Sequence, residues 1–217
     1  MHRLTLPLVL AIVALGAGCS SLDRSRNLAN PAVSGQTLAQ QVCSNCHGMD
    51  GNSVSPNFPN LAAQQKDYLI AQLNAFRQPG RSDPAGFEYM WGLSHNLTDR
   101  QIGELADYFA AQKVVSPGAG NALQAAKGKQ IFEEGITARQ TPPCKACHGE
   151  HGTGDGMFPR IGYQHADYIV KQLAVFKRTD QRPDGAMMKV VAHGLAKENM
   201  KDVAQYLQGM TASGPAR

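Results

Sequence analysis

The sequence repeats itself with a period near 100 residues, and this duplication constrains the fold more than any other feature. Residues 58–77 align without gaps on residues 158–177, and eight of these twenty positions are identical. Further along, residues 97–109 align in the same order on residues 195–207. Two copies of this length predict two similar domains, each close to the usual domain size of about 100 residues.

Both copies have the apolar spacing of helices. Apolar residues at i, i+3, i+4 and i+7 recur in 102–109 and in 200–207, which is the pattern of one face of an amphipathic helix. Similar spacing predicts a second helix in each copy, over 68–76 and 168–176. We find no alternating apolar pattern of strand length, so the fold class predicted is all-α.

The ends of the two copies set the expected domain boundaries. The segment Ser-Pro-Gly-Ala-Gly at 116–120 stops any helix, and it lies within a predicted linker at 113–122. The domains expected on either side are 35–112 and 123–210. The two copies of the last helix differ at their start, because Thr98 with Gln101 predicts a capping box in the first copy. Ala196 at the equivalent place predicts a less firm start in the second.

The N-terminus has the features of an export signal. A short basic start precedes an apolar stretch from Leu4 to Ala17, too short to span a bilayer comfortably. We expect residues 1–18 to be a signal peptide of the lipoprotein type and Cys19 to be lipidated, although Leu15 lies four rather than three residues before it. A plain secretory signal is the alternative. Residues 19–34 then form a polar tether, and the protein is expected in the periplasm, held at a membrane.

Charge excludes one class of partner and suggests another. The formal net charge is only +4 and is spread along the chain, so nucleic-acid binding is not expected. The two halves differ, because 20–120 has seven basic and eight acidic residues whereas 121–217 has thirteen and nine. We therefore expect the halves to meet different partners, with the basic C-terminal half facing an acidic surface.

Each copy contains one Cys-x-x-Cys-His motif, and these motifs hold every cysteine of the chain except Cys19. Two thiols three positions apart on a helical turn project to one side, where they can reach the two vinyl groups of one porphyrin. The histidine that follows places an imidazole beneath the same ring, as a ligand for its iron. We therefore predict two covalently bound haem c groups. The attachment cysteines would be Cys43, Cys46, Cys144 and Cys147, and the first axial ligands His47 and His148.

Zinc binding and thiol redox chemistry also use paired cysteines, but they fit this chain less well. A zinc ribbon would use all four thiols at one metal, whereas these two pairs lie about 100 residues apart and each has its own histidine. A thioredoxin-type pair needs a βαβ setting, which the helical spacing does not provide. Haem attachment is therefore the favoured interpretation.

The order of motifs resembles the cytochrome c4 family of two-haem cytochromes. In both copies CxxCHG is followed by Phe-Pro, a helix with DYxxxQL, a methionine, and a last helix ending in AxYF or AxYL. The resemblance covers both halves, roughly from Gly35 to Gln208. It implies two tandem cytochrome c-like domains, and it implies that backbone carbonyls at Pro59 and Pro159 accept the ring N–H of the proximal histidines.

The repeat register also suggests the second axial ligand of each iron. Met90 and Met188 lie seven residues before the aligned Leu97 and Leu195. A thioether at an equivalent place in both copies, about forty residues after the histidine, fits the distal ligand of a cytochrome c domain. Met187 is the competing choice in the second copy, and the register favours Met188.

A histidine also recurs in register after each of these methionines. His95 and His193 each follow by five residues. Such histidines would either lie at the surface or contact a propionate, or they would replace methionine in bis-histidine ligation. The second arrangement would lower both reduction potentials relative to histidine–methionine ligation.

Two filled axial positions leave no open iron site for a substrate, so the chain is expected to transfer electrons and not to be an enzyme. We expect it to shuttle single electrons between respiratory-chain partners, for example from a quinol-oxidising complex to a terminal oxidase. A dedicated electron-accepting subunit of a periplasmic dehydrogenase is the alternative. A haem enzyme is the third possibility, but the chain is short for a two-haem peroxidase and neither domain has a spare cysteine ligand.

Overall fold

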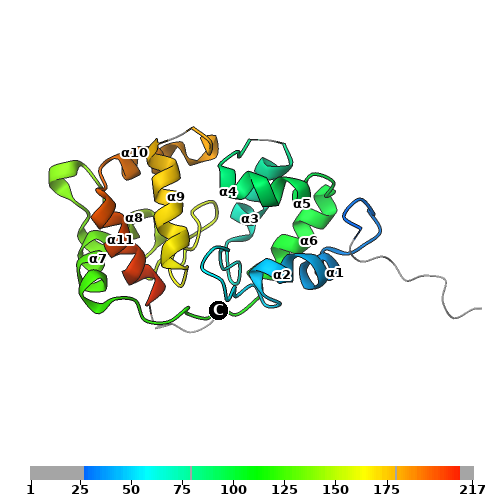
Figure 1. Cartoon of the computed structure of the whole chain (residues 1–217), viewed down its shortest axis with the longest axis horizontal. Coiled ribbons are helices and arrows are strands. Elements are labelled where there is room, and N and C mark those ends of the chain that lie inside the picture. The colour runs from blue at the N-terminus through cyan, green and yellow to red at the C-terminus, as the bar shows by residue number, and fades with distance from the viewer. Residues whose placement is uncertain (1–26, 79, 179, 211–217) are drawn as a thin grey trace, which may run out of the picture.

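A computed structural model describes residues 27–78, 80–178 and 180–210 as two helical lobes side by side (Figure 1). The predicted signal peptide 1–18, Cys19 and the first part of the tether lie outside the described residues. Within the described ranges, extended backbone pairs only at two isolated bridges, Ile136 with Thr141 and Asp155 with Phe158. The prediction of an all-α fold from two tandem domains is confirmed.

The N-terminal lobe is built around three helices that pack together, α1, α3 and α6. Their apolar faces meet in one core, to which α6 contributes the buried Ile102, Leu105 and Phe109. These three residues belong to the periodic pattern that predicted this helix. The lobe comprises α1 (Gly35–Leu38), a π-helical turn (Ala39–Cys43), α2 (Ser44–His47), α3 (Lys66–Arg77), α4 (Pro84–Gly86), a second π-helical turn (Phe87–Trp91), α5 (Gly92–Ser94) and α6 (Asp99–Ala110).

The C-terminal lobe repeats this arrangement with a longer first helix. Its first and last helices, α7 and α11, pack closely and α9 crosses beside them. The core includes the fully buried Phe132 from α7 and Val203 and Leu207 from α11. The lobe comprises α7 (Ala122–Glu134), a 3-10 turn (Thr137–Arg139), α8 (Lys145–His148), α9 (Ala166–Arg178), a 3-10 turn (Pro183–Gly185), α10 (Ala186–His193) and α11 (Lys197–Gln208).

The two last helices begin as their sequences predicted. Thr98 accepts a hydrogen bond from the backbone N–H of Gln101, and the Gln101 side chain accepts one from the backbone N–H of Thr98 at 3.0 Å. Ala196 has no side-chain oxygen for the first of these bonds. The Asn199 side chain still accepts the N–H of Ala196 at 3.0 Å, so α11 keeps half of the capping box.

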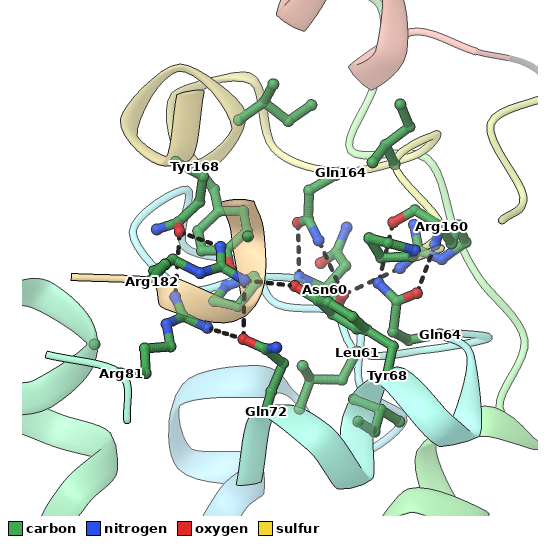
Figure 2. A pocket seen from close by; sticks show the side chains of 18 of the residues that line it. Asn60, Leu61, Gln64, Tyr68, Gln72, Arg81, Arg160, Gln164, Tyr168 and Arg182 are labelled. Carbon is green, nitrogen blue, oxygen red and sulfur yellow. Dashed lines mark hydrogen bonds between the residues drawn. The ribbon is translucent and has the colours of Figure 1, made fainter. Parts of the chain in front are cut away.

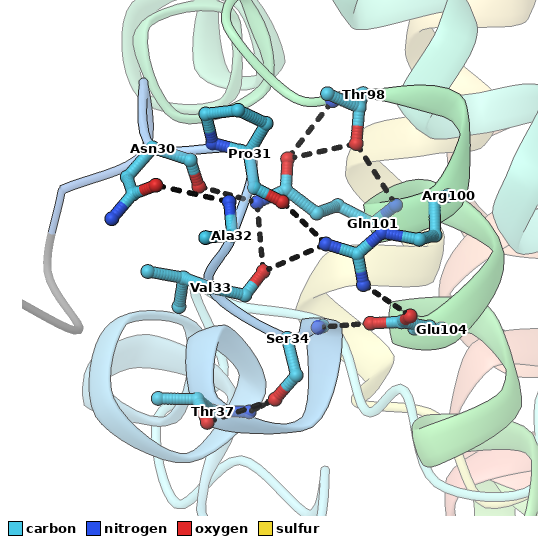
Figure 3. Close-up of polar contacts among 11 residues, drawn as sticks. Asn30, Pro31, Ala32, Val33, Ser34, Thr37, Thr98, Arg100, Gln101 and Glu104 are labelled. Atoms are coloured by element: carbon cyan, nitrogen blue, oxygen red, sulfur yellow. Dashed lines mark hydrogen bonds and ion pairs between the residues drawn. The ribbon is translucent and has the colours of Figure 1, made fainter. Parts of the chain in front are cut away.

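The packed part of the N-terminal lobe begins before the expected boundary at Gly35. Residues 27–34, which were expected to belong to the tether, lie against α6 (Figure 3). The Gln101 side chain donates to the carbonyls of Asn30 and Val33 at 3.0 Å each, and the Val33 side chain is buried in the core. The apolar Val33 and the buried amide of Gln101 explain why this polar stretch is held. Within the described residues, each helix is too short or too polar to traverse a lipid bilayer.

Candidate functional site

Each Cys-x-x-Cys-His motif starts at the N-cap of a short helical turn, α2 or α8, and continues through it. Both turns border one cavity of about 880 Å³. The cavity extends from one lobe into the other. Its wall includes every cysteine and axial histidine predicted from the two motifs, together with both methionines chosen from the repeat register: Cys43, Cys46, His47, Met90, Cys144, Cys147, His148 and Met188. Residues about 100 positions apart in sequence therefore line one space.

The two histidines are buried and held in the same way. Nδ1 of His47 lies 2.9 Å from the carbonyl oxygen of Pro59, and Nδ1 of His148 lies 2.8 Å from that of Pro159. Burial lowers the pKa of both rings, against the opposing effect of these bonds, so both imidazoles are neutral near pH 7. A neutral ring that donates from Nδ1 has its Nε2 lone pair available for a metal.

The first thiol of each motif has a different environment from those of redox-active cysteines. Burial raises the pKa of Cys43 to about 12 and that of Cys144 to about 11. Reactive cysteines have a lowered pKa and are thiolates near neutral pH. These two sites therefore do not favour thiol–disulfide chemistry, whereas they are compatible with thioether attachment to an apolar ring.

The methionines and the recurring histidines lie in different places. Met90 and Met188 line the cavity. His95 and His193 are exposed and are not part of its wall, and the His95 ring instead packs on Trp91 with the ring centroids 4.8 Å apart. This placement favours methionine over bis-histidine ligation. The axial roles of the methionines stay a prediction.

A π-helical turn brings Met90 to the cavity despite a length difference between the copies. From Gly86 to Met90 the chain advances four residues, whereas from Gly185 to Met188 it advances three. The Phe76 and Phe176 rings face these two glycines in the same way. The extra residue falls where the π-helical turn Phe87–Trp91 occurs, and such turns are the usual way for a helix to absorb one inserted residue.

The wall between the lobes contains a nearly symmetric cluster of arginines and glutamines (Figure 2). Arg81 donates to the side-chain oxygens of Gln72 and Gln172 at 2.8 and 3.2 Å. Arg182 donates to the same two oxygens at 2.9 and 2.6 Å. Each guanidinium thus contacts both domains, and each lies over a phenylalanine of its own domain, Phe76 or Phe176.

The buried charges on this wall do not balance. Arg81, Arg160 and Arg182 are each at least 94% buried, but Asp83 is the only acidic residue of the described cavity wall with a buried side chain. The Nε atoms of Arg160 and Arg182 have no hydrogen-bond partner. Buried guanidinium groups of this kind call for carboxylate ligands. The two propionates of a haem are such carboxylates, so these arginines fit the predicted cofactor.

Comparison with known proteins agrees with this site. A model of the cytochrome c family matches residues 32–113 and again 125–211. Cytochrome c4 of Pseudomonas aeruginosa is 35% identical over 214 residues, which is 97% of this chain and 100% of that protein. The chain belongs to the cytochrome c4 family. Members of this family bind two covalent haem c groups and transfer electrons, and both statements hold for this protein.

Solved structures of cytochrome c4 share the fold. The reduced recombinant cytochrome c4 from Pseudomonas stutzeri superposes with a TM-score of 0.74 and 33% identity, over 82% of this chain and 97% of that one. Cytochrome c4 of Acidithiobacillus ferrooxidans gives 0.72 and 42%, over 76% and 96%. Cytochrome c-552 of Acidithiobacillus ferridurans is 41% identical over 77% of this chain and 73% of its own length.

A second group of similar proteins consists of a thiosulfate dehydrogenase and an electron acceptor of such an enzyme. The thiosulfate dehydrogenase electron acceptor of Stutzerimonas stutzeri is 29% identical over 79% of this chain and 80% of its own length. A thiosulfate dehydrogenase structure from Marichromatium purpuratum matches 84% of this chain with a TM-score of 0.73 and 28% identity. The match spans 41% of that chain.

In this cytochrome c4 a bound haem c supplies a one-electron iron couple. The chain supplies the surroundings that set how readily the electron is held. Pro59 and Pro159 orient the imidazoles, the apolar wall excludes water, and the buried arginines add positive charge between the lobes. Positive charge near a redox centre favours its reduced form, so the arginine cluster is expected to raise the reduction potentials.

Sequence reasoning did not identify the glutamines and arginines of this cluster. A signal was present for some of them, because Gln64, Tyr68 and Gln72 recur at identical places in the second copy and are spaced by four residues. In a continuous helix that spacing would put them on one face; in the structure α3 begins at Lys66, so Tyr68 and Gln72 share a helix and Gln64 lies just before it. Polar residues that are identical in both copies at this spacing indicate a shared interface.

Proposed function

We propose that this cytochrome c4 shuttles single electrons between respiratory-chain partners, from a quinol-oxidising complex to a terminal oxidase, and has no enzymatic activity of its own. The observation that carries the proposal is the one cavity that contains both Cys-x-x-Cys-His motifs and both Met90 and Met188. With a thioether opposite each histidine, neither iron keeps a free position for a substrate.

The ligand assignment has a direct spectroscopic test. A ferric haem with a methionine ligand has a weak absorption band at the red edge of the visible spectrum. The purified oxidised protein should show this band at an intensity corresponding to two haems. If the band is missing, the methionine assignment fails, and with it the argument that both irons are closed.

The choice of partner is tested by kinetics with isolated complexes. The reduced protein is mixed in a stopped-flow instrument with a terminal oxidase, and the oxidised protein with a quinol-oxidising complex. Both reactions should run faster than catalytic turnover, and charge reversal of Lys197 and Lys201 on the exposed face of α11 should slow one of them and flatten its salt dependence. Lys66, in the other domain, is the matched control. Slow reaction with both complexes would contradict the proposal.

A second function has specific support. The protein is similar to a thiosulfate dehydrogenase electron acceptor and to a thiosulfate dehydrogenase structure. This similarity favours a role as the dedicated electron acceptor of a periplasmic dehydrogenase. The same stopped-flow experiment with a thiosulfate dehydrogenase and thiosulfate distinguishes the two. Reduction by this enzyme at a rate far above that by the quinol-oxidising complex would favour the second function.

We also propose a periplasmic location with a lipid anchor at Cys19. The support is the apolar stretch from Leu4 to Ala17 that ends just before this cysteine, the only one outside the two motifs. Mass spectrometry of the mature protein should find a lipidated N-terminal cysteine, and Cys19→Ser should release the protein into the soluble periplasmic fraction. A mature N-terminus at any other residue would contradict the anchor.

A further inference from the structure

We propose that each domain positions the axial histidine of the other domain, through one glutamine and one peptide group. Gln164 of the C-terminal domain acts on His47, and Gln64 of the N-terminal domain acts on His148. The inference rests on these histidines being the iron ligands, and it concerns how the two haem sites influence one another within one molecule.

The contacts to His47 run through the peptide group that joins Pro59 to Asn60. The carbonyl oxygen of this group lies 2.9 Å from Nδ1 of His47. The N–H of the same group, on Asn60, donates to Oε1 of Gln164 at 2.8 Å. One peptide group is therefore hydrogen-bonded to the ring of one domain on its carbonyl side and to the other domain on its N–H side.

The second domain contains the reciprocal arrangement. The carbonyl oxygen of Pro159 lies 2.8 Å from Nδ1 of His148, and the N–H of Arg160 in that peptide group donates to Oε1 of Gln64 at 2.6 Å. Both glutamines also donate from Nε2 to the carbonyl of the same residue, Arg160 or Asn60, at 3.0 Å each. Each glutamine thus holds its partner residue by two hydrogen bonds.

These groups are buried and shielded from water. Asn60, Gln64, Arg160 and Gln164 are all at most 6% exposed, and Figure 2 shows them together between the lobes. The residue before each glutamine has left-handed backbone, with φ of 52° at Ala63 and 61° at Tyr163.

Left-handed backbone is unfavourable for residues with a side chain. Its recurrence at the same place in both copies indicates a constraint that both domains satisfy. The backbone N–H groups of the two strained residues, Ala63 and Tyr163, donate to the last helix of their own domain, at the carbonyls of Phe109 and Leu207. Each glutamine is therefore fixed to its own core while its side chain reaches into the other domain.

A hydrogen bond accepted from the N–H of a peptide group polarises that group and strengthens its carbonyl as an acceptor. A stronger acceptor draws the Nδ1 proton of the histidine further from the ring and makes the imidazole a better donor to its metal. Better donation favours ferric iron. Loss of the Gln164 oxygen should therefore raise the reduction potential of the N-terminal site, and loss of the Gln64 oxygen that of the C-terminal site.

The test uses the full holoprotein with Gln164→Leu and Gln64→Leu. In the reduced, ¹⁵N-labelled protein, NMR resolves the Nδ1–H signal of each axial histidine and the amide of Asn60 and of Arg160. We expect Gln164→Leu to move the His47 signal upfield, to speed hydrogen exchange at the Asn60 amide, and to leave the His148 signal in place. Gln64→Leu should give the converse result.

Two further variants separate positioning from simple loss of packing. Gln65→Leu removes a different bond between the domains, from Nε2 of Gln65 to the Thr153 carbonyl at 2.9 Å, and should move neither histidine signal. Gln164→Glu keeps an acceptor for the Asn60 N–H and makes it stronger when ionised. It should move the His47 signal downfield and lower the N-terminal potential, opposite to Gln164→Leu.

The proposal requires a crossed pattern, in which each glutamine variant shifts the signal of the histidine in the other domain and leaves that of its own domain in place. If each glutamine variant shifts the histidine of its own domain, shifts both histidines equally, or shifts neither, the proposal is overturned. The unmodified protein is measured first, because the porphyrin strongly shifts the NMR signals of the ring protons of an axial histidine. Absence of those signals overturns the ligand assignment itself, whereas their presence without a crossed pattern overturns only the positioning role. The kinetic test of the respiratory partners is independent of both results.

Discussion

Nε of Arg81 lies 2.7 Å from Oδ1 of Asp83, in an ion pair whose side chains are 5% and 1% exposed. Through its other nitrogens Arg81 reaches a glutamine of each domain. The pair therefore fixes a guanidinium at the boundary between the lobes. A buried pair of this kind contributes little compared with a well-packed apolar pair, but leaving one partner alone is costly.

Removal of the aspartate should destabilise the protein strongly. Asp83→Ala leaves Arg81 buried without its carboxylate, so we expect the free energy of unfolding to fall by about 3–5 kcal/mol. Chemical denaturation followed by circular dichroism measures the change. Asp107→Ala is the control, because its pair with Lys66 is 49% and 61% exposed and such surface pairs contribute at most about 1 kcal/mol. Equal losses in the two variants would contradict the prediction.

The same aspartate should make stability depend on acid. Burial alone would raise the pKa of Asp83, but the hydrogen bond and charge of Arg81 outweigh it and hold the pKa below its usual value, which is about 3.9. The folded state then binds fewer protons than the unfolded state. The contribution of the Asp83 carboxylate to stability is complete above pH of about 4. It is lost as the pH falls through the lower pKa that Asp83 has in the folded state.

Denaturant titrations at a series of pH values test this. Wild-type stability should fall more steeply below pH of about 4 than that of Asp83→Asn, whose side chain cannot titrate, and the two curves should converge in acid. Parallel curves over the whole range would show that the ionisation of Asp83 has no such effect.

The adjacent methionines of the second domain offer a matched pair for the ligand assignment. Both methionines line the cavity, but Met188 packs against the core of its lobe whereas Met187 is 62% exposed. We expect Met188→Ala to halve the red-edge absorption band of the ferric protein and to lower the C-terminal reduction potential, because a thioether ligand favours ferrous iron. Met187→Ala should leave the band unchanged. The reverse result would assign the role to Met187.

The helices and the haem-attachment residues could be predicted from the sequence, whereas the residues around the site could not. The helices containing Ile102, Phe109, Val203 and Leu207 were predictable because burial of an apolar face leaves a period in the sequence. The cysteines and histidines were predictable because their chemistry requires a fixed local spacing. Both signals are short-range, and the duplication doubled each of them.

The surroundings of the site were harder to predict, because they depend on how the two copies meet. Arg81 and Arg182 occupy similar places in the cluster but do not align, since Arg81 follows Phe76 by five residues and Arg182 follows Phe176 by six. Asn60 and Arg160 do align but differ in type. Contacts between domains leave no apolar period in either copy, so only the repeated glutamines and tyrosine indicated this interface.

The contact between α7 and α11 in the C-terminal lobe can be tested by substituting a glycine, with a second helical glycine of the same chain as the control. A Cβ added at Gly128 of α7 would lie 2.0 Å from the carbonyl oxygen of Asp202 and 2.9 Å from Cβ of Tyr206, both on α11. The obstruction is mainly backbone, so it can be relieved only by separating the two helices.

We expect Gly128→Ala to lower the free energy of unfolding by about 3 kcal/mol, at the upper end of the usual cost of overpacking. Gly103 lies inside α6, and a Cβ added there meets no atom within 4 Å. Gly103→Ala should therefore raise stability by about 0.5–1 kcal/mol, because alanine is the better helix former. The two variants add the same methyl group to a helical glycine, so denaturation curves that shift in opposite directions would assign the difference to the contact with α11. Two shifts of the same sign would mean that the close approach of α7 to α11 does not depend on Gly128.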